Sequence, residues 1–376
     1  MQPRLAAIVT GPITYVDHVG VLAYLLDMPL FITELDVYEK TRELYPQIQA
    51  KYCSLEDLDA EFLSTHFDAI FESGKFFAQQ MGPMVEWLYK KRMRFVYCPH
   101  GHSDKGWSAK SYPKQDLSFV YGPHMLEILT HSGAIKQINE TLETVNYRLH
   151  SYRAFQDFYD TQTRLHLKAL DPAKPVVLYA PSWDDGENPT SFFSKTKQLI
   201  YELKDDYNLI IKLHPFLERF HPAKTHNMIE RYIYEPRAQF ITNFPCIYPL
   251  LQQADLYIGD YSSIGYDYLS FDKPLYFFIR EAAPKFALHN TGLIIPEDTN
   301  IAAFIGQTLK ENKQKYSEKR RALYKYVFGE EKDISCLKGE TLDLILKNPM
   351  RSVCTTPHKD KKPSIKPLPF WAQSQS

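Results

Sequence analysis

The chain has 376 residues, which is long enough for two domains, and its 44% hydrophobic and 24% charged residues are ordinary for a soluble globular protein. A formal net charge of −1 excludes a generally basic nucleic-acid-binding protein, so we expect no nucleic-acid partner. The five cysteines are odd in number, lie far apart and form no C-x-x-C pair, which favours reduced thiols in the cytoplasm over disulfides or a zinc site. No apolar run approaches the roughly 20 residues of a membrane helix.

The first half of the chain alternates short apolar runs with helical stretches. Each run ends in a turn that contains Gly, Ser or His, as in Thr-Gly-Pro at 10–12 and Pro-His-Gly-His at 99–102. This alternation predicts an open parallel sheet flanked by helices. The expected strands of this half are 5–9, 29–33, 68–71, 95–98 and 117–121.

Residues 138–170 are polar and lean towards helix, with no strand signal. A break follows at Asp-Pro-Ala-Lys-Pro, 171–175, and a second alternation of strands and helices begins after it. We therefore expect two α/β domains with parallel sheets, at 1–150 and 151–345. Residues 346–376 are rich in Pro, Lys and Ser, which is typical of a disordered tail.

One stretch of the second half, 255–269, reads as a strand, a turn and a helix. Leu256 to Ile258 is a short buried strand, and Asp-Tyr-Ser-Ser at 260–263 is the turn. Ser262 or Ser263 can cap the helix, whose unpaired N–H groups at the end of a strand favour an anion. The alternative is that the two serines act only as a cap. The other expected strands of this half are 176–179, 209–213, 239–242, 274–279 and 292–295, and a basic helix is expected at 301–326.

Four turns follow strand ends, at 99–102, 180–183, 212–215 and 260–263, and ligands bind at such ends in open α/β sheets. Two of these turns contain His100 and His214, whose imidazoles can transfer protons or hold a phosphate oxygen near neutral pH. The alternatives are that His100 fills a turn and that His214 is a hydrogen-bonded core residue. The position of Lys212 inside a strand leaves open whether its side chain faces the site. His18 follows the first Gly-Pro turn, which is a favourable location.

The sequence shows no His-x-x-x-His helix and no carboxylate–histidine cluster, so we expect no metal ion. It also lacks a P-loop and a well-placed G-x-G-x-x-G, which argues against a P-loop ATPase or an NAD enzyme.

The order of the motifs is informative as a set. A His-Gly turn at 100–101 is followed by Tyr-Ala-Pro-Ser-Trp-Asp-Asp at 179–185, Lys-Leu-His-Pro at 212–215 and Asp-Tyr-Ser-Ser at 260–263, with Asp-Lys-Pro-Leu-Tyr-Phe-Phe at 272–278. This order resembles the CDP-glycerol glycerophosphotransferase family of teichoic-acid polymerases and primases. The resemblance implies the GT-B fold, in which two Rossmann-like domains with parallel sheets face each other. It also implies a transferase that works without a metal or another cofactor.

The resemblance further implies roles for individual residues. His100 matches the base that accepts the proton of the acceptor hydroxyl, and His214 matches a histidine that steadies the donor phosphates. The residues expected to bind the nucleotide donor are Ser182, Trp183, Lys212, Pro215, Asp260, Tyr261, Ser262 and Ser263. The residues expected on the acceptor side are Gly11, His18, Gly101 and His102.

The chain departs from the family pattern in two places. The His-Gly turn continues as His-Ser-Asp-Lys rather than in the Thr-Pro-Leu form, and the loop at 327–336 lacks an Asp-Gly and a nearby Arg. Three functions therefore stay open: transfer of phosphoglycerol or a related alcohol phosphate from a CDP donor, transfer of a sugar from a nucleotide-sugar, and nucleotide binding without catalysis. We expect a lipid-linked or glycan acceptor. The basic helix and tail are expected either to contact an anionic membrane peripherally or to be only solvated.

Overall fold

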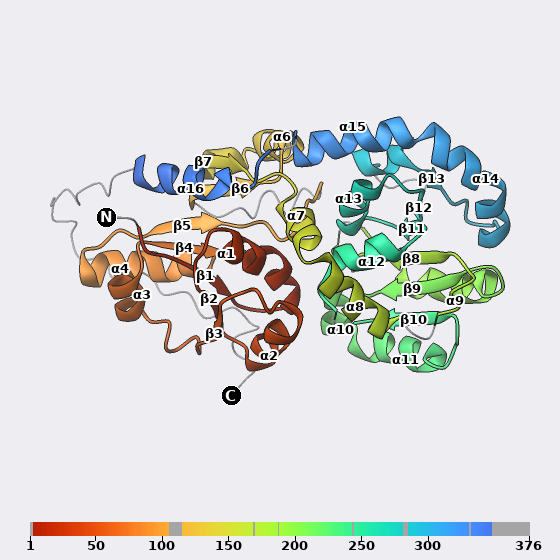
Figure 1. Cartoon of the computed structure of the whole chain (residues 1–376), viewed down its shortest axis with the longest axis horizontal. Helices are drawn as coiled ribbons and strands as arrows, with labels where there is room; N and C mark the ends of the chain where they lie inside the picture. Colours follow the sequence, from red (N-terminus) through yellow and green to blue (C-terminus); the bar gives the residue numbers. More distant parts are fainter. Residues whose placement is uncertain are drawn as a thin grey trace.

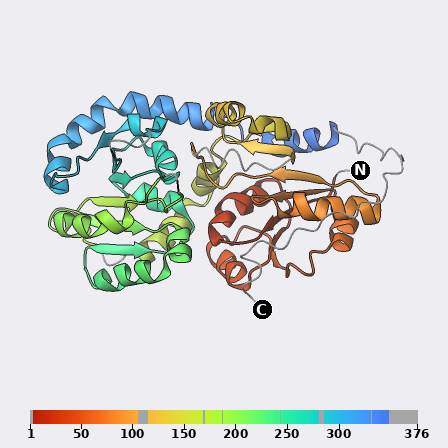
Figure 2. The same cartoon turned by 180° about the vertical axis from the view of Figure 1, so that it is seen from behind.

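The protein consists of two α/β units that lie side by side, connected through the helices α7 (Tyr147–Ala154) and α8 (Gln156–His166) (Figure 1). This computed structural model describes residues 3–104, 115–167, 170–186, 188–242, 244–280, 285–330 and 332–347. The view from behind shows the same two units with the same helices between them (Figure 2). The predicted α/β class is confirmed.

The first unit is built on a seven-stranded sheet in the order β3-β2-β1-β4-β5-β6-β7, in which every described pairing is parallel. Its inner strands are apolar on both faces, as β1 shows with four of its five residues buried, because helices cover both sides of the sheet. The strands are β1 (Leu5–Val9), β2 (Leu30–Ile32), β3 (Ala50–Tyr52), β4 (Ala69–Glu72), β5 (Arg94–Tyr97), β6 (Gln115–Val120) and β7 (Ile138–Glu143).

The second unit is built on a six-stranded parallel sheet in the order β10-β9-β8-β11-β12-β13. All residues of β9 and β11 are buried, again because helices pack on both faces. The strands are β8 (Val176–Ala180), β9 (Asn208–Lys212), β10 (Ala238–Ile241), β11 (Leu256–Gly259), β12 (Leu275–Phe277) and β13 (Leu293–Ile294).

The helices bury one apolar stripe each against these sheets. In α9 (Phe192–Leu203), for example, Phe192, Leu199 and Leu203 are buried at helical spacing. The remaining helices are α1 (Val21–Leu25), α2 (Leu35–Leu44), α3 (Ala60–His66), α4 (Gly82–Tyr89), α6 (Pro123–His131), α10 (Pro215–Phe220), α11 (Pro222–Tyr232), α12 (Ile247–Gln253), α13 (Ile264–Tyr268), α14 (Ile301–Lys315), α15 (Ser317–Phe328) and α16 (Cys336–Lys347).

Two edge strands correct the sequence prediction. Residues 138–170 were expected to contain no strand, yet β7 pairs with β6 from Gln115–Ile138 to Val120–Glu143. β3 was also missed, and it pairs only with β2. An edge strand has a partner on one side only and keeps several side chains in water, so its sequence carries polar residues instead of an apolar run.

The predicted basic helix at 301–326 is two helices, because the chain breaks at Tyr316 between α14 and α15. Arg320 explains the break, since its guanidinium donates to the backbone carbonyls of Asn312 (3.1 Å) and Lys313 (2.9 Å) at the end of α14. Arg320 is fully buried and forms an ion pair with Asp272 at 2.7 Å. It therefore does not belong to an exposed basic face, unlike the other basic residues of these two helices.

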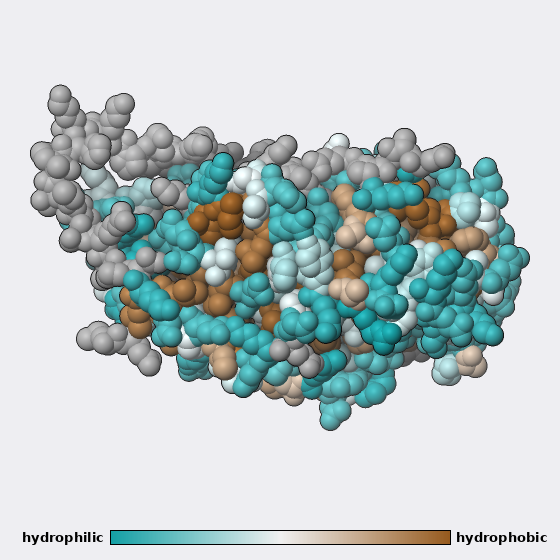
Figure 3. Space-filling view, turned by 90° about the horizontal axis from the view of Figure 1, so that it is seen from above, coloured by the Kyte–Doolittle hydropathy of each residue, from teal (hydrophilic) through white to brown (hydrophobic). Residues whose placement is uncertain are grey.

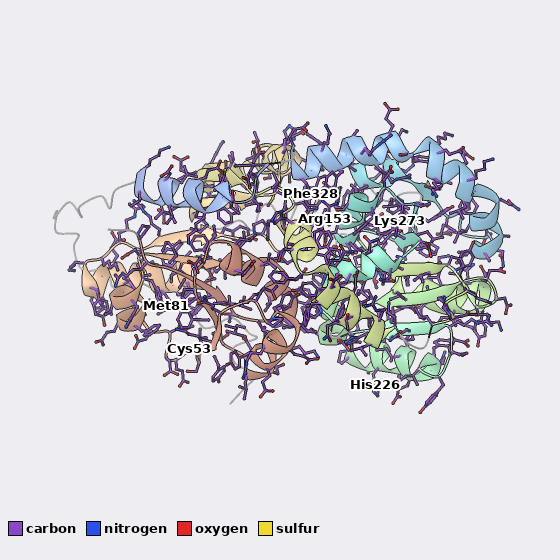
Figure 4. All side chains as sticks on the ribbon, in the orientation of Figure 1. Cys53, Met81, Arg153, His226, Lys273 and Phe328 are labelled. Carbon is purple, nitrogen blue, oxygen red and sulfur yellow. The ribbon has the colours of Figure 1, made fainter. Side chains whose placement is uncertain are left out.

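The end of the described chain returns to the first unit. Phe328, labelled in Figure 4, lies at the end of α15, where its ring packs edge-on against Tyr121 at 5.8 Å between centroids. At Gly122 a Cβ atom would lie 2.6 Å from the nitrogen of Gly329, so this glycine permits the close approach of the two segments. α16 then runs along the first unit (Figure 1).

The domain limits 1–150 and 151–345 stay a prediction. Residues 348–376, which make up most of the predicted tail, lie outside the described residues. Among the described residues no helix is long and apolar enough to cross a membrane. On the face seen from above in Figure 3, hydrophobic residues form separate patches between hydrophilic ones.

Candidate active site

A cleft lies between the two units, and the carboxyl ends of strands from both sheets line it. Its walls come from the turns after β1 and β5 of the first unit and after β8, β9 and β11 of the second. This is the edge where open parallel sheets bind ligands. The cleft is lined by all predicted site residues other than Gly11 and Asp260, namely His18, His100, Gly101, His102, Ser182, Trp183, Lys212, His214, Pro215, Tyr261, Ser262 and Ser263.

The His-Gly turn of the first unit touches the Ser-Ser turn of the second. Gly101 has a φ of +132°, and a Cβ atom there would lie 3.2 Å from Ser263 Oγ. Glycine is therefore favoured by the backbone conformation, and the close approach leaves little room for a larger side chain. This contact places His100 directly at the junction of the two units.

The imidazole of His100 is exposed to the cleft and packs against Tyr15, with 4.6 Å between ring centroids. Enclosure by the cleft walls lowers the pKa of His100, while the solvent-exposed part of the ring limits this shift. The ring is therefore neutral at pH 7 and can accept a proton.

His18 is a buried positioning residue for the same turn. Its Nδ1 lies 2.8 Å from the hydroxyl of Tyr121, which donates to the carbonyl of Pro99 at 3.0 Å. Burial and the nearby guanidinium of Arg148 lower the pKa of His18 well below its ordinary value, so it is neutral. The chain of hydrogen bonds fixes the backbone that precedes His100.

Gly11 lies beside the cleft and not in its wall. Its backbone N–H donates to Glu34 Oε1 at 2.9 Å, and its φ is +108°. The structure thus gives Gly11 a role in the first turn and separates it from the predicted acceptor residues.

Lys212 faces the cleft although it ends β9. Its side chain is buried, and its ammonium group donates to the carbonyl of Leu213 at 3.1 Å. Burial lowers the pKa of Lys212 to about 8, so the group is still cationic at pH 7. A buried cation without a carboxylate ion pair among the described residues is suited to an anionic ligand.

His214 caps α10 through its side chain. Its Nδ1 accepts the backbone N–H of Phe216 at 3.2 Å, so in the neutral ring the proton is on Nε2. Trp183 lies beside it, with 6.2 Å between the ring centroids, and stacks on Phe220 at 5.2 Å. His214 therefore combines a structural role with a donor nitrogen.

The strand–turn–helix prediction for 255–269 is confirmed by β11 and α13, but the capping prediction is wrong. Ser263 is the N-cap of α13 and makes no side-chain capping hydrogen bond. α13 has only five residues, which gives it little macrodipole. The suitability of this turn for a ligand therefore rests on its side chains and their position in the cleft.

Asp260 lies behind the turn and holds it to the neighbouring strand. Its carboxylate accepts the backbone N–H groups of Ser182 (2.7 Å) and Ser191 (2.9 Å). It also accepts the Ser191 hydroxyl at 2.7 Å. Asp260 is 1% exposed and thus positions Ser182, whose own buried hydroxyl has no hydrogen-bond partner among the described residues.

The sequence did not reveal a buried ion-pair cluster that joins the two units. Arg148 donates from Nε to Asp17 Oδ2 at 3.0 Å and from Nη1 to Asp267 Oδ2 at 2.9 Å. Tyr45 donates to Asp17 at 2.7 Å, and Tyr248 lies 3.1 Å from Asp267 Oδ1. We call Asp17, Arg148 and Asp267 the arginine clamp, because it fixes α7 to both walls of the cleft.

A second cluster contradicts the expectation that no carboxylate and histidines come together. His102, Asp104 and His124 offer ligand atoms that all lie within 4.8 Å of one another. His124 comes from α6 and the other two residues from the segment after the His-Gly turn, so their proximity depends on the fold.

The comparisons with known proteins agree with this geometry. The family described as CDP-Glycerol:Poly(glycerophosphate) glycerophosphotransferase matches residues 151–329. The match covers somewhat less than half of the chain. The resemblance predicted from the motifs is confirmed for the half of the chain that contains the second sheet.

Curated relatives align over similar parts of the chain. The teichoic acid poly(glycerol phosphate) polymerase of Staphylococcus epidermidis is 29% identical over 192 residues, which cover 46% of this chain and 25% of the relative. The teichoic acid glycerol-phosphate primase of Bacillus spizizenii is 28% identical over 172 residues, which cover 45% of this chain and 41% of the relative. The aligned part thus spans less than half the length of these relatives.

Solved structures show the fold. The wall teichoic acid polymerase TagF superposes with a TM-score of 0.60 at 19% identity, covering 92% of this chain and 88% of that one. The Anabaena protein HepE, in a complex with UDP-glucose, superposes with a TM-score of 0.54 at 12% identity, covering 92% and 99%. The predicted GT-B arrangement of two facing parallel sheets is confirmed.

Proposed function

We propose that this protein transfers a phosphoglycerol group, or a related alcohol phosphate, from a CDP-activated donor to an acceptor hydroxyl. The observation that carries the proposal is the contact between the His100-Gly101 turn and Ser263 across the cleft. It brings a base from one unit to the edge where the family-matched unit offers groups for phosphates.

The donor diphosphate would lie on the second unit. Lys212 supplies a buried positive charge, and the His214 ring, whose Nδ1 accepts the N–H of Phe216, carries its proton on Nε2 when it is neutral. Hydroxyls of Ser182, Ser262 and Ser263 line the same wall. Phosphoryl transfer depends on such positioning and on donors for the developing charge, and the enclosed cleft strengthens both.

The reaction is a substitution at the phosphorus that carries glycerol. The acceptor oxygen attacks this phosphorus, its proton passes to His100, and a phosphodiester forms. The bond to the bridging oxygen of the diphosphate breaks, and CMP leaves with the electron pair. His18 and Tyr121 hold the backbone before His100 in place during the reaction.

His100→Ala tests the role of the base. We expect transfer to fall by about two to four orders of magnitude, the usual contribution of a general base, while CDP still binds. Activity is measured as CMP release with CDP-glycerol and a lipid-linked or poly(glycerol phosphate) acceptor, and CDP affinity by calorimetry. If the variant turned over at the wild-type rate, the assignment of His100 would be wrong.

We also propose that the protein acts in the cytoplasm with peripheral contact to an anionic membrane, where a lipid-linked acceptor is present. The basic residues that α14 and α15 expose support this: Lys310, Lys313, Lys315, Lys319, Arg321 and Lys325. Each can contribute about 1 kcal/mol near an anionic surface. Co-sedimentation with anionic vesicles should weaken as salt rises, and binding that ignores salt would contradict the proposal.

A further inference from the structure

His102, Asp104 and His124 form a compact buried cluster at the edge of the cleft. His102 Nε2 lies 2.9 Å from His124 Nδ1. Asp104 Oδ1 lies 3.4 Å from His124 Nε2 and 3.9 Å from His102 Nε2. The side chains are only 1% (His102), 10% (Asp104) and 11% (His124) exposed.

The carboxylate of Asp104 is oriented by a residue of the other unit. Its Oδ2 accepts the hydroxyl of Tyr266 from α13, which leaves Oδ1 turned towards the two imidazoles. No Lys or Arg among the described residues forms an ion pair with Asp104. A buried carboxylate needs a compensating positive charge, and the described side chains do not supply a permanent one.

His102 is incompletely satisfied. Its Nε2 is paired with His124, but its Nδ1 is buried and has no hydrogen-bond partner among the described residues. An unpaired buried polar atom costs roughly 1–3 kcal/mol.

We propose that His102, Asp104 and His124 bind a divalent transition-metal ion of the zinc class. Two imidazoles and one carboxylate suit Zn²⁺, Co²⁺ or Mn²⁺ better than Mg²⁺, which prefers an all-oxygen shell. Ligand atoms of a tetrahedral zinc ion lie about 3.3 Å apart, so the three ligand atoms, one from each residue and all within 4.8 Å of one another, would draw closer together around a bound ion. Tyr266 supplies the outer hydrogen bond that orients a ligating carboxylate.

Such an ion would join three parts of the cleft. It would fix the segment after the His100-Gly101 turn to α6, and through Tyr266 it would tie this segment to the helix that follows Ser262 and Ser263. His102 and Asp104 occupy positions where the chain departs from the Thr-Pro-Leu form of the family it resembles. The proposed metal site therefore depends on residues that differ from the family pattern.

The competing arrangement is a hydrogen-bonded relay from Asp104 through His124 to His102. The 2.9 Å contact between the imidazoles fits such a relay without any ion. A relay would bind no zinc-class ion, so a measurement of metal binding distinguishes the two arrangements.

The experiment uses the purified full chain after treatment with a chelator and reloading with Zn²⁺ or Co²⁺. Bound metal is quantified by elemental analysis, the cobalt form by its visible absorption, and stability by thermal unfolding. We expect a single equivalent of metal, the absorption of low-symmetry four- or five-coordinate cobalt, and a higher melting temperature with metal than without. These measurements do not depend on transfer activity, so they can fail or succeed independently of the proposed function.

His124→Ala and the isosteric Asp104→Asn should each weaken metal affinity by more than about tenfold. The matched control is His131→Ala, which removes a histidine from the same helix whose side chain is 75% exposed, and it should bind metal as the wild type does. Far-UV circular dichroism checks that each variant is folded. A chelator-treated wild type that takes up no ion would overturn the proposal, and equal uptake by His124→Ala would show an adventitious ion only.

Discussion

Two buried polar clusters connect the units of this protein, and they differ in how their charges are compensated. In the arginine clamp, both carboxylates are paired with Arg148, and tyrosine hydroxyls occupy further positions. In the cluster of His102, Asp104 and His124, the carboxylate faces two imidazoles and the Tyr266 hydroxyl but no described Lys or Arg, and one ring nitrogen has no partner among the described residues. The difference indicates that the clamp serves the structure and that the histidine cluster is prepared for a ligand.

Arg148→Met breaks the compensated cluster and should have the largest effect. It leaves Asp17 and Asp267 buried without a cation, which costs about 3–5 kcal/mol when one partner of a buried pair is lost. Chemical denaturation measures the change in the free energy of unfolding. The control is Arg153→Met on the exposed side of the same helix, which should stay within about 0.5 kcal/mol of wild type. Similar small losses for both variants would show that the clamp is not structural.

Gly101→Ala tests the contact between the two turns. The φ of +132° and the 3.2 Å approach to Ser263 Oγ predict that the turn moves, and a shift of about 1 Å can cost roughly a hundredfold in rate. Gly133→Ala is the matched control, because Gly133 has a φ of +74° but no atom within 4 Å of an added Cβ. Only Gly101→Ala should lose CMP release. Equal losses of CMP release in both variants would show that backbone strain, and not the contact with Ser263, causes the effect.

On the donor side of the cleft, Lys212 is a buried cation that has no carboxylate ion pair among the described residues. With its pKa lowered to about 8, the ammonium is mostly charged at pH 7 and mostly neutral at pH 9.5, so it pairs with phosphates at the lower pH. CDP affinity should therefore fall about tenfold over this range, consistent with one hydrogen bond to a charged group. Calorimetry of Lys212→Gln should show weak, pH-independent binding, while the exposed Lys224→Gln keeps the wild-type slope. A slope that persists in Lys212→Gln would assign the titration to another group.

Of these variants, Asp104→Asn should have the smallest effect on stability. The carboxylate has no permanent cation among the described residues, so in metal-free protein its neutralisation should change the unfolding free energy by less than about 1 kcal/mol. Denaturation in the presence of a chelator measures this. A loss as large as that of Arg148→Met would mean that Asp104 is already compensated in the metal-free protein.

The inner strands and the cleft residues could be predicted from the sequence because both are local signals. Apolar runs that end in Gly, Ser or His turns mark the buried strands and their carboxyl ends, and those turns line the cleft. β7 was missed because an edge strand keeps polar residues, and the direction of the Lys212 side chain is not visible in a strand without its neighbours.

The two clusters could not be predicted because their members are distant in sequence. Arg148 lies 131 residues from Asp17 and 119 residues from Asp267, and His124 lies 22 residues from His102. Only the packing of α6, α7 and α13 around the cleft brings them together. The Asp next to His18 and the Asp after the Ser-Ser turn were visible in the sequence, but nothing there identified their partner.

The choice of donor tests the proposed function most directly. Purified protein is given CDP-glycerol, CDP-activated alcohols, UDP-sugars and CMP-sugars in turn, with a lipid-linked or poly(glycerol phosphate) acceptor, and the released nucleotide and extended acceptor are identified by mass spectrometry. We expect CMP release from CDP-glycerol together with an acceptor that is heavier by one glycerol phosphate. Transfer of a sugar from a nucleotide-sugar, or nucleotide binding without release from any donor, would contradict it.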